Sequence, residues 1–260
     1  MPDKNCLFSI IIVSNVKGQD LIETIDSVLS QKFSDFELIV KFDGQEISSI
    51  KNSYKGFSNI KFITQSDIGI YDAMNQAIDH ASGDYALFLN VGDKLYDSHS
   101  LGYVHSQSTL NADVLYSPYL YRQNIIQYPK KLSRGFFFRN ALCHQSYFLR
   151  TKLLKTLRFN LDYRVLADHD ILLRGQQSTD ITFEKINRPI ATLALMGFSA
   201  KNVKTKNYER KKLEFEHFSP WEFVYFSIFS ILSLRSVRRH LVNYVLIYYF
   251  YNRIKNWFYR

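Results

Sequence analysis

The hydrophobic and polar positions of residues 1–95 follow two periods, one typical of buried strands and one typical of helices. Residues 8–14 (FSIIIVS) form a short continuous apolar run of β-branched type, which predicts a strand buried on both faces. In residues 21–29 the apolar side chains recur at helical spacing. Asp20 and Glu23 stand at the start of this predicted helix like the two members of a capping box.

The same two patterns alternate further along the chain. Residues 36–42 and 59–63 are predicted strands, residues 73–81 form a predicted helix closed by Gly83, and residues 85–89 are a fourth predicted strand. Parallel neighbours in a sheet need crossover connections, which helices usually supply. The order of elements therefore predicts an α/β domain with a mostly parallel, twisted sheet and flanking helices.

Polar residues come directly after the predicted strands, namely Ser14, Asp43, Asp67 and Asp93. Each position taken alone is also explained by an ordinary turn, because Asp, Asn and Gly are common turn residues. The carboxyl ends of parallel strands meet at one edge of the sheet, where α/β proteins bind ligands. Three carboxylates gathered at that edge repel one another unless a cation or a hydrogen-bonding ligand is present.

The sequence lacks the motifs of the commoner nucleotide-binding and hydrolytic sites. There is no GxGxxG after the first predicted strand and no GxxxxGK[ST], and neither GxSxG nor HExxH occurs. Mg²⁺ and Mn²⁺ bind carboxylate oxygens and complete their shells with phosphate oxygens and water. An acid-rich edge without a glycine cradle therefore indicates a site where a divalent cation carries the phosphates.

The net charge of +9 is concentrated at one end of the chain. Residues 201–260 hold 12 Lys and Arg against 4 Asp and Glu, a net charge of +8, which leaves +1 for residues 1–200. Cys6 and Cys143 belong to no CxxC pattern, so we expect a reduced, intracellular chain. An acid precedes the first apolar run, and we expect this run to be a strand instead of a signal peptide.

Residues 8–93 resemble the N-terminal half of glycosyltransferase family 2, the inverting nucleotide-sugar transferases with a GT-A fold. The most specific block is GIYDAMNQAI…ASGDYALFLN.GD in residues 69–93, which is similar to the branch that builds bacterial surface polysaccharides of the colanic acid, O-antigen and capsule type. The resemblance continues through CHQSYFLR (143–150), DYRVLADHDILLR (162–174) and MGFSAKN (196–202). It therefore implies a GT-A domain over residues 1–200 and does not extend to the rest of the chain.

The resemblance implies a donor site in residues 1–95. Asp43 matches the acid that holds the uracil or uridine, Ser14 lies in a loop that lines the same pocket, and Asp67 borders the nucleoside. Asn90 to Asp93 take the place of the family's Asp-x-Asp motif, with Asp93 as the carboxylate that contacts Mn²⁺ or Mg²⁺. One carboxylate suffices when the diphosphate supplies the other oxygens. We expect Asp93 to lie at an exposed strand end.

The resemblance implies an acceptor-binding half in residues 96–200. Asp168 in ADHD matches the family's general base, and the start of a helix is an equally good explanation of this acid, since the two roles are compatible. Asp170 is interpreted as structural. His144 and Gln145 match an HQ pair on the acceptor side, and they either contact the acceptor or diphosphate or are ordinary core residues.

The leading hypothesis is a metal-dependent inverting hexosyltransferase that uses a UDP-sugar and a glycan or polyprenyl-diphosphate-linked acceptor. The alternative is a catalytically inactive GT-A-like scaffold in a polysaccharide assembly complex, since one acid remains in the metal motif. A nucleic-acid-binding protein is suggested by the sequence pI of ≈ 9.3. We disfavour it because the charge lies in an aromatic tail without a readout motif.

Residues 201–260 are predicted to be a basic, aromatic, helical tail. Its apolar runs 220–234 and 241–251 are separated by RSVRRH (235–240), and both are too short to span a bilayer. Helices that pack on the body explain part of this pattern. Aromatic residues on nearly all helical faces and flanking cations are typical of helices in the membrane interface. We therefore expect a peripheral protein on the inner face of the cell membrane, with anionic lipid contacted through residues 219–260.

Overall fold

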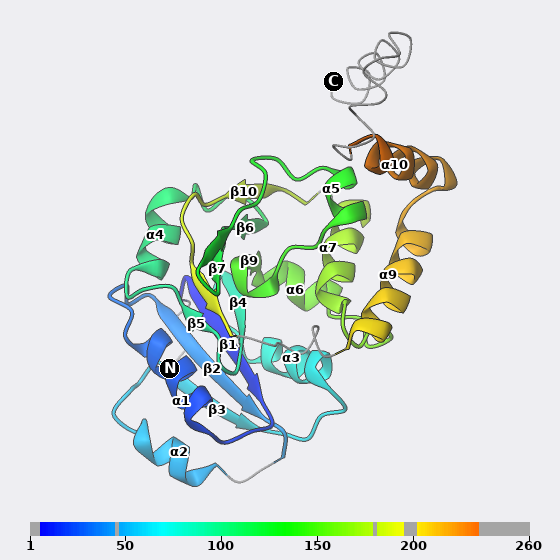
Figure 1. Cartoon of the computed structure of the whole chain (residues 1–260). Coiled ribbons are helices and arrows are strands. Elements are labelled where there is room, and N and C mark those ends of the chain that lie inside the picture. The colour runs from blue at the N-terminus through cyan, green and yellow to red at the C-terminus, as the bar shows by residue number, and fades with distance from the viewer. Residues whose placement is uncertain (1–5, 45–46, 179–180, 195–201, 234–260) are drawn as a thin grey trace. The chain divides into compact units, whose positions relative to one another are not determined.

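The computed structural model of the chain describes residues 6–44, 47–178, 181–194 and 202–233. The chain divides into two compact units, Met1–Lys211 and Lys212–Arg260, which are described separately (Figure 1). All the site residues expected from the sequence lie in the first unit.

A seven-stranded sheet forms the centre of the first unit. In spatial order its strands are β10 (Phe183–Lys185), β6 (Val114–Tyr116), β9 (Tyr147–Arg150), β4 (Tyr85–Asn90), β1 (Phe8–Ser14), β2 (Phe36–Phe42) and β3 (Ile60–Thr64). β4, β1, β2 and β3 are parallel to one another, whereas β9 is antiparallel to both of its neighbours. The mixed sheet with flanking helices confirms the predicted fold class.

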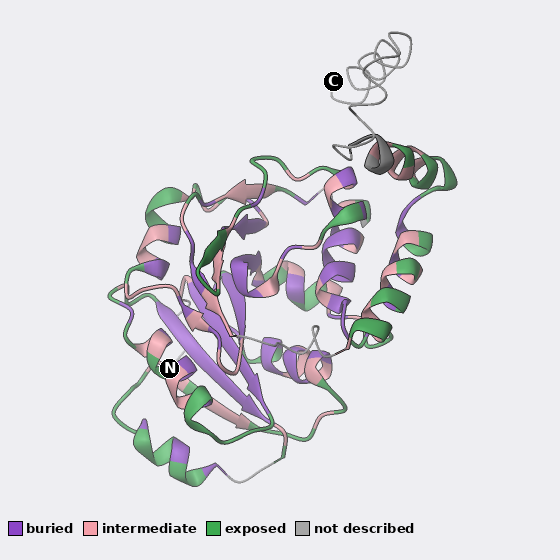
Figure 2. Cartoon of the chain, in the orientation of Figure 1, coloured by how far each residue is buried: buried purple, intermediate pink, exposed green. Residues whose placement is uncertain are grey.

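The four parallel strands follow the sequence prediction closely. β1 and β2 have the predicted bounds, and every residue in them is buried, so the expectation of strands covered on both faces is confirmed (Figure 2). Ile11 of β1 is paired with Ile39 of β2 and with Phe88 of β4. This register places the carboxyl ends of the three strands at one edge of the sheet.

A second, four-stranded sheet and the helices complete the secondary structure of the described residues. The second sheet has the order β5 (Lys94–Leu95), β11 (Ala191–Leu193), β7 (Tyr119–Tyr121) and β8 (Asn124–Ile126). The helices are α1 (Gln19–Leu29), α2 (Ser48–Ser53), α3 (Ile70–Asp79), α4 (Ser100–Gln107), α5 (Arg134–Arg139), the 3-10 turn η1 (His144–Ser146), α6 (Thr151–Leu157), α7 (Ala167–Ser178), α9 (Val203–His217) and α10 (Pro220–Ser233).

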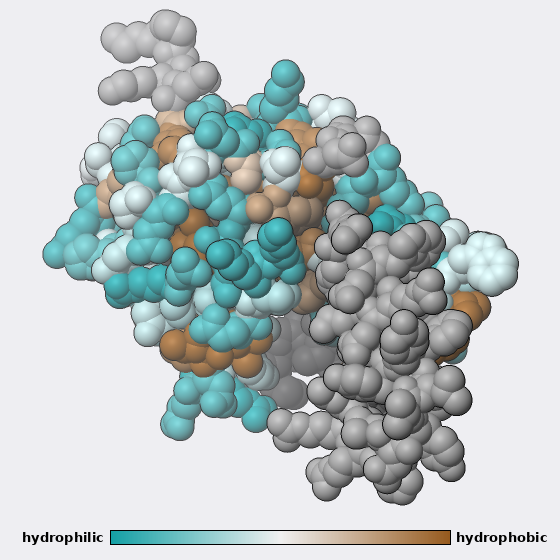
Figure 3. Space-filling model, turned by 90° about the horizontal axis from the view of Figure 1, so that it is seen from above, coloured by the Kyte–Doolittle hydropathy of each residue, from teal (hydrophilic) through white to brown (hydrophobic). Residues whose placement is uncertain are grey.

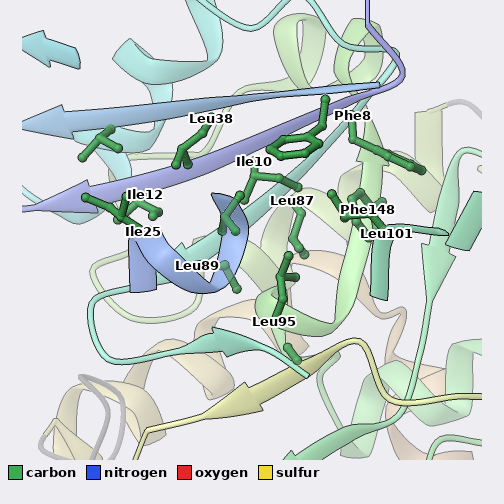
Figure 4. Packing of buried hydrophobic residues seen from close by; sticks show 14 of the residues in the cluster. Phe8, Ile10, Ile12, Ile25, Leu38, Leu87, Leu89, Leu95, Leu101 and Phe148 are labelled. Atoms are coloured by element: carbon green, nitrogen blue, oxygen red, sulfur yellow. The ribbon is translucent and has the colours of Figure 1, made fainter. Parts of the chain in front are cut away.

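One face of the central sheet packs against α1 and α4. Ile10 of β1 belongs to the same buried cluster as Ile25 of α1, Leu101 of α4 and Leu87 of β4 (Figure 4). Each such side chain contributes roughly 1.5–3 kcal/mol when it is fully removed from water. This packing fixes the strands whose ends carry the candidate site.

The helices differ from the sequence prediction in three details. The N-cap of α1 is Gly18 without a side-chain cap, and Glu23 pairs with Lys94, so the predicted Asp20–Glu23 capping box is not formed. α3 begins at Ile70, directly after Gly69, and ends two residues before the predicted 73–81 helix does. α2 was not predicted, because its six residues are mostly polar and too few to show a helical period.

The described part of the second unit contains the end of α9 and the helix α10. Several apolar side chains of α10 are exposed, with Trp221 at 83% and Phe223, Val224 and Ile228 at 45–52%. On the described surface that is visible in Figure 3, by contrast, hydrophilic side chains surround small hydrophobic patches. Within residues 6–233, gaps excepted, no helix is long and apolar enough to cross a membrane. The predicted apolar run 241–251 lies outside the described residues.

Candidate active site

A cleft of ≈ 610 Å³ lies at the carboxyl ends of β1 and β2. Its walls include the loop before α3 with the first turn of that helix, and the loop 161–164. Ser14, Asp43 and Asp67 all line it. The structure thus brings these three residues around one cavity at the edge of the sheet, and their role in donor binding stays a prediction.

Hydrogen bonds shape the acidic wall of the cleft. The main-chain N–H of Asp67 donates to Oδ1 of Asp43 (3.1 Å), and the N–H of Gly69 donates to Oδ1 of Asp67 (3.1 Å). Ser14 bonds locally through its hydroxyl, which donates to the carbonyl of Val16 at 2.7 Å. No described hydrogen bond uses Oδ2 of Asp43, so this oxygen can accept one from a ligand.

A buried lysine offsets part of this negative charge. Lys41, the last residue but one of the mostly apolar strand β2, has an exposure of 0%, and its ammonium group is paired with Oδ2 of Asp67. A buried charge is tolerated only when it is paired. The acids at this edge were expected to need a cation or a hydrogen-bonding ligand, and for Asp67 the protein itself supplies a cation. The pairing could have been suspected from the sequence, because a lysine within the mostly apolar run FELIVKF needs a partner when the strand is buried.

Asp93 is buried, with an exposure of 3%, and it accepts three hydrogen bonds. These come from the side chain of Gln145 (2.7 Å), the N–H of Ala194 (2.8 Å) and the N–H of Asn90 (3.1 Å). Burial raises the pKa of Asp93, and the hydrogen bonds oppose this rise. The expectation of an exposed Asp93 is wrong, because η1 and the residue after β11 bring their donors to it.

The residues around Asp93 fit a divalent cation. The main-chain N–H of Asn90 donates to the Asp93 carboxylate, and Oδ1 of Asn90 is buried without a hydrogen-bond partner, so this residue has a free oxygen of the kind that Mg²⁺ and Mn²⁺ prefer. Among the residues that the structure describes, no group of three or more His, Cys, Asp or Glu side chains could hold a metal ion. A cation bound here would therefore need oxygens from its substrate.

Asp168 lies in the first turn of α7 and forms a pair with His144 of η1. Nδ1 of His144 is 3.0 Å from Oδ2 of Asp168, and both side chains are largely buried, at 13% and 14% exposure. Nε2 of His144 is buried and lacks a partner. The structure thus joins two residues expected from the sequence, and it separates His144 from Gln145, whose side chain points to Asp93.

Two further residues of this region were missed by sequence reasoning. The hydroxyl of Tyr71 shares its single proton between the carbonyl of Val165 (2.8 Å) and Oδ1 of Asp168 (3.2 Å). Burial and the neighbouring Asp168 charge raise the pKa of Tyr71 well above its usual value, so Tyr71 stays a donor at neutral pH. Arg164 lines the cleft, four residues before Asp168. In the sequence, only the position of Arg164 within the segment DYRVLADHD could have indicated that it belongs to the site.

Asp170 forms no part of this arrangement. It is buried and pairs with Arg174 one turn later in α7, at 2.7 Å. This geometry agrees with the structural role expected for it.

A larger concavity of ≈ 940 Å³ lies near the amino end of β4 and contains none of the expected site residues. Lys155, which lines it, donates to the carbonyl of Ala81 at 2.8 Å, and Lys61 pairs with Glu37 at 2.9 Å. These cations already have partners in the protein. The chemistry of the chain therefore points to the smaller cleft.

Known protein sequences match most of this chain. Glycosyl transferase family 2 matches residues 9–167. A PGL/p-HBAD biosynthesis glycosyltransferase of Mycobacterium bovis is 35% identical over 181 residues, which are 65% of this chain and 69% of that protein. The amylovoran biosynthesis glycosyltransferase AmsB of Erwinia amylovora is 27% identical over 97 residues, 35% of this chain and 32% of that protein.

Solved structures share the fold. TarS 1-349 of S. aureus in complex with UDP-GlcNAc has a TM-score of 0.60 at 17% identity, over 75% of this chain and 60% of that one. Glucosyl-3-phosphoglycerate synthase from Mycobacterium tuberculosis, in complex with Mn²⁺, UDP and phosphoglyceric acid, has a TM-score of 0.56 at 13% identity, over 80% of this chain and 78% of that one. The fold is therefore GT-A, as expected. With the family match covering more than half of its residues, the chain belongs to glycosyl transferase family 2.

Proposed function

We propose that this protein transfers a sugar from a UDP-sugar to a glycan or polyprenyl-diphosphate-linked acceptor, with inversion at the anomeric carbon, in the biosynthesis of a bacterial surface polysaccharide. One observation carries the proposal. The loop 161–164 that walls the acidic cleft leads directly into the turn that holds Asp168. A nucleotide in the cleft would thus lie beside a carboxylate suited to act as a base. The relatives are named as glycosyltransferases of PGL/p-HBAD biosynthesis and of amylovoran biosynthesis, which supports a role in glycan assembly.

Different residues of the cleft bind different parts of the nucleotide-sugar donor. The free oxygen of Asp43 accepts a hydrogen bond from the uracil or the ribose, as the acid of a nucleoside pocket does. Arg164 brings a guanidinium, a group whose donors match phosphate oxygens. The structural relatives include one with UDP-GlcNAc bound, which supports a uridine nucleotide.

Asp93 and Asn90 are the residues that would hold a divalent cation. When bound, Mn²⁺ or Mg²⁺ supplies Lewis-acid neutralisation of the charge that develops on the departing diphosphate. Gln145 and the N–H of Ala194 orient the Asp93 carboxylate through their hydrogen bonds. The structural relatives with Mn²⁺ support this assignment.

Asp168 takes the proton of the acceptor hydroxyl as that oxygen attacks the anomeric carbon. His144 and Tyr71 hold one carboxylate oxygen each, which keeps the group in a single orientation. One base and one displacement leave no covalent intermediate, so the product has the inverted configuration.

A thermal shift across a panel of nucleotide sugars with Mn²⁺ tests the proposed function. A ligand at about 100 times its Kd stabilises a protein by about 2.7 kcal/mol, and in a domain of this size that raises Tm by about 5–10 °C. We expect this rise with UDP-sugars and a smaller one with GDP-sugars. Asp43→Ala is expected to remove most of it.

The catalytically inactive scaffold remains the second candidate, favoured by the three hydrogen bonds that already engage Asp93. Hydrolysis of the donor with Mn²⁺ separates the two. A scaffold shows the thermal shift without releasing UDP, and an enzyme shows both. A salt-dependent shift of DNA in a gel would instead revive a nucleic-acid-binding function.

We also propose that residues 219–260 hold the protein on anionic membrane at the inner face of the cell membrane. The exposed apolar side chains of α10 support this, because interfacial helices bury such residues at headgroup level. The basic segment 235–240, which lies outside the described residues, contains three arginines. Each adds about 1 kcal/mol near an anionic surface.

Truncation after Phe218 is expected to abolish flotation with vesicles that contain phosphatidylglycerol and to leave donor binding unchanged. The reason is that truncation removes both the exposed apolar helix and the cations. Flotation of full-length and truncated protein with anionic and with purely zwitterionic vesicles measures the effect. If the truncated protein floats, or the full-length protein never does, the tail is not an anchor.

A further inference from the structure

Glu209 of α9 is a buried carboxylate outside the residues considered so far. Its exposure is 4%. It accepts three hydrogen bonds from consecutive main-chain N–H groups. Oε1 receives that of Arg164 at 2.7 Å, and Oε2 receives those of Val165 and Leu166 at 2.9 Å each. A carboxylate removed from water is costly unless such donors replace its hydration.

These three amides belong to the segment that leads into α7. Leu166 caps this helix, since its carbonyl accepts from the N–H of His169 (3.1 Å) and of Asp170 (2.9 Å). The first N–H groups of a helix have no partner within the helix. Glu209 supplies acceptors to the adjoining N–H groups from 43–45 residues further along the chain.

The same short segment carries two parts of the proposed site. Arg164 at its start lines the donor cleft, and Asp168 at its end is the proposed base. Tyr71 holds the segment from another side, because its hydroxyl donates to the carbonyl of Val165. The peptide groups of Val165 are therefore fixed by α3 at the carbonyl and by α9 at the N–H.

From this geometry we propose that Glu209 is a positioning residue of the active site. Its carboxylate holds segment 164–168 in the orientation in which Arg164 faces the donor phosphates and Asp168 faces the acceptor. The proposal rests on the proposed function. It adds to the site a residue from α9, beyond the residues 9–167 over which the family matches.

Glu209→Gln tests the proposal with little change in volume. The substitution replaces one acceptor oxygen by an NH₂ group that faces main-chain N–H donors, so at least one of the three hydrogen bonds is lost. A displacement of about 1 Å in a reacting group costs about 10²-fold in rate. We expect kcat to fall by about 10- to 100-fold and the Kd for UDP to rise several-fold.

Hydrogen exchange supplies a readout that does not depend on activity. In Glu209→Gln the amides of residues 164–166 are expected to exchange at least about tenfold faster than in the wild type, and the amides of β1 are expected to stay protected. Glu216→Gln is the matched control, because it makes the same change on the same helix at an exposed carboxylate. It should leave kinetics and exchange unchanged.

Three results overturn the proposal. One is Glu209→Gln with kcat and Kd within twofold of the wild type. Another is a variant with lower Tm but wild-type kinetics per folded molecule, which makes Glu209 merely structural. The third is a wild-type protein that neither binds nor hydrolyses UDP-sugars. That last result contradicts the proposed function as well. It is distinguished from the other two because it is observed in the wild-type protein, without any substitution.

Discussion

Asp168→Asn is expected to lower kcat by about 10²- to 10⁴-fold, the usual contribution of a general base, while the affinity for the nucleotide sugar stays unchanged. The amide keeps the volume of the side chain and can still accept a hydrogen bond from Tyr71. It cannot take a proton from an acceptor hydroxyl. Steady-state kinetics at saturating donor and calorimetric titration with the UDP-sugar in the absence of acceptor measure the two quantities separately.

Asp162→Asn is the matched control, because Asp162 is an exposed acid in the loop before α7. It should leave kcat within twofold of the wild type. NMR of the product gives an independent check, since a single displacement inverts the anomeric configuration. Retention of configuration, or an Asp168→Asn variant with wild-type turnover, would show that Asp168 is not the base.

Asp93→Asn is expected to abolish transfer. The amide has a weaker oxygen ligand and no negative charge for Mn²⁺ or Mg²⁺. It also turns an NH₂ group toward the donors of Ala194 or Gln145, so we expect a loss of stability of about 1–3 kcal/mol, which is a few degrees in Tm. The protein should remain folded, because the change leaves no cavity. Donor turnover with and without EDTA, together with a thermal melt, measures both effects.

The raised pKa of Asp93 adds a pH dependence to the metal-free protein. The folded state binds this proton more tightly than the unfolded chain does, so the contribution of Asp93 to stability is full below its ordinary pKa and is lost as the pH rises through the raised pKa. Between acid and neutral pH, the Tm of the wild type should therefore fall with rising pH by more than the Tm of Asp93→Asn, which has no group to titrate at this position. Asp84→Asn, at an exposed acid by the opposite end of β4, is the control for this pH dependence.

For the metal assignment, the contradicting outcome is full activity of the wild-type protein in EDTA.

The parallel half of the central sheet could be predicted from the sequence because its strands are buried on both faces. Such strands are continuous apolar runs, and β1 and β2 accordingly have their predicted bounds. The strands after residue 95 are only three or four residues long, too short for a period to show. α2 was missed for the same reason.

The position of Ser14, Asp43 and Asp67 around one cleft was also predictable, since parallel strands bring their carboxyl ends to one edge. The burial of Asp93 was not. Its donors come from Gln145, 52 residues away, and from Ala194, 101 residues away, and no local pattern connects them. Asp93 was therefore expected to be exposed, as a residue in a turn usually is.

The sequence by itself determined the α/β order, the parallel strands, and the residue types at the strand ends that mark a family 2 glycosyltransferase. Local periodicity can do this because it records which face of each element meets the core. Only the tertiary structure decided which polar groups are partners, namely Lys41 with Asp67, His144 with Asp168, and Glu209 with the amides of segment 164–166. A buried charge takes whichever partner the completed fold brings within hydrogen-bond distance, and that depends on chain topology rather than on neighbouring residues.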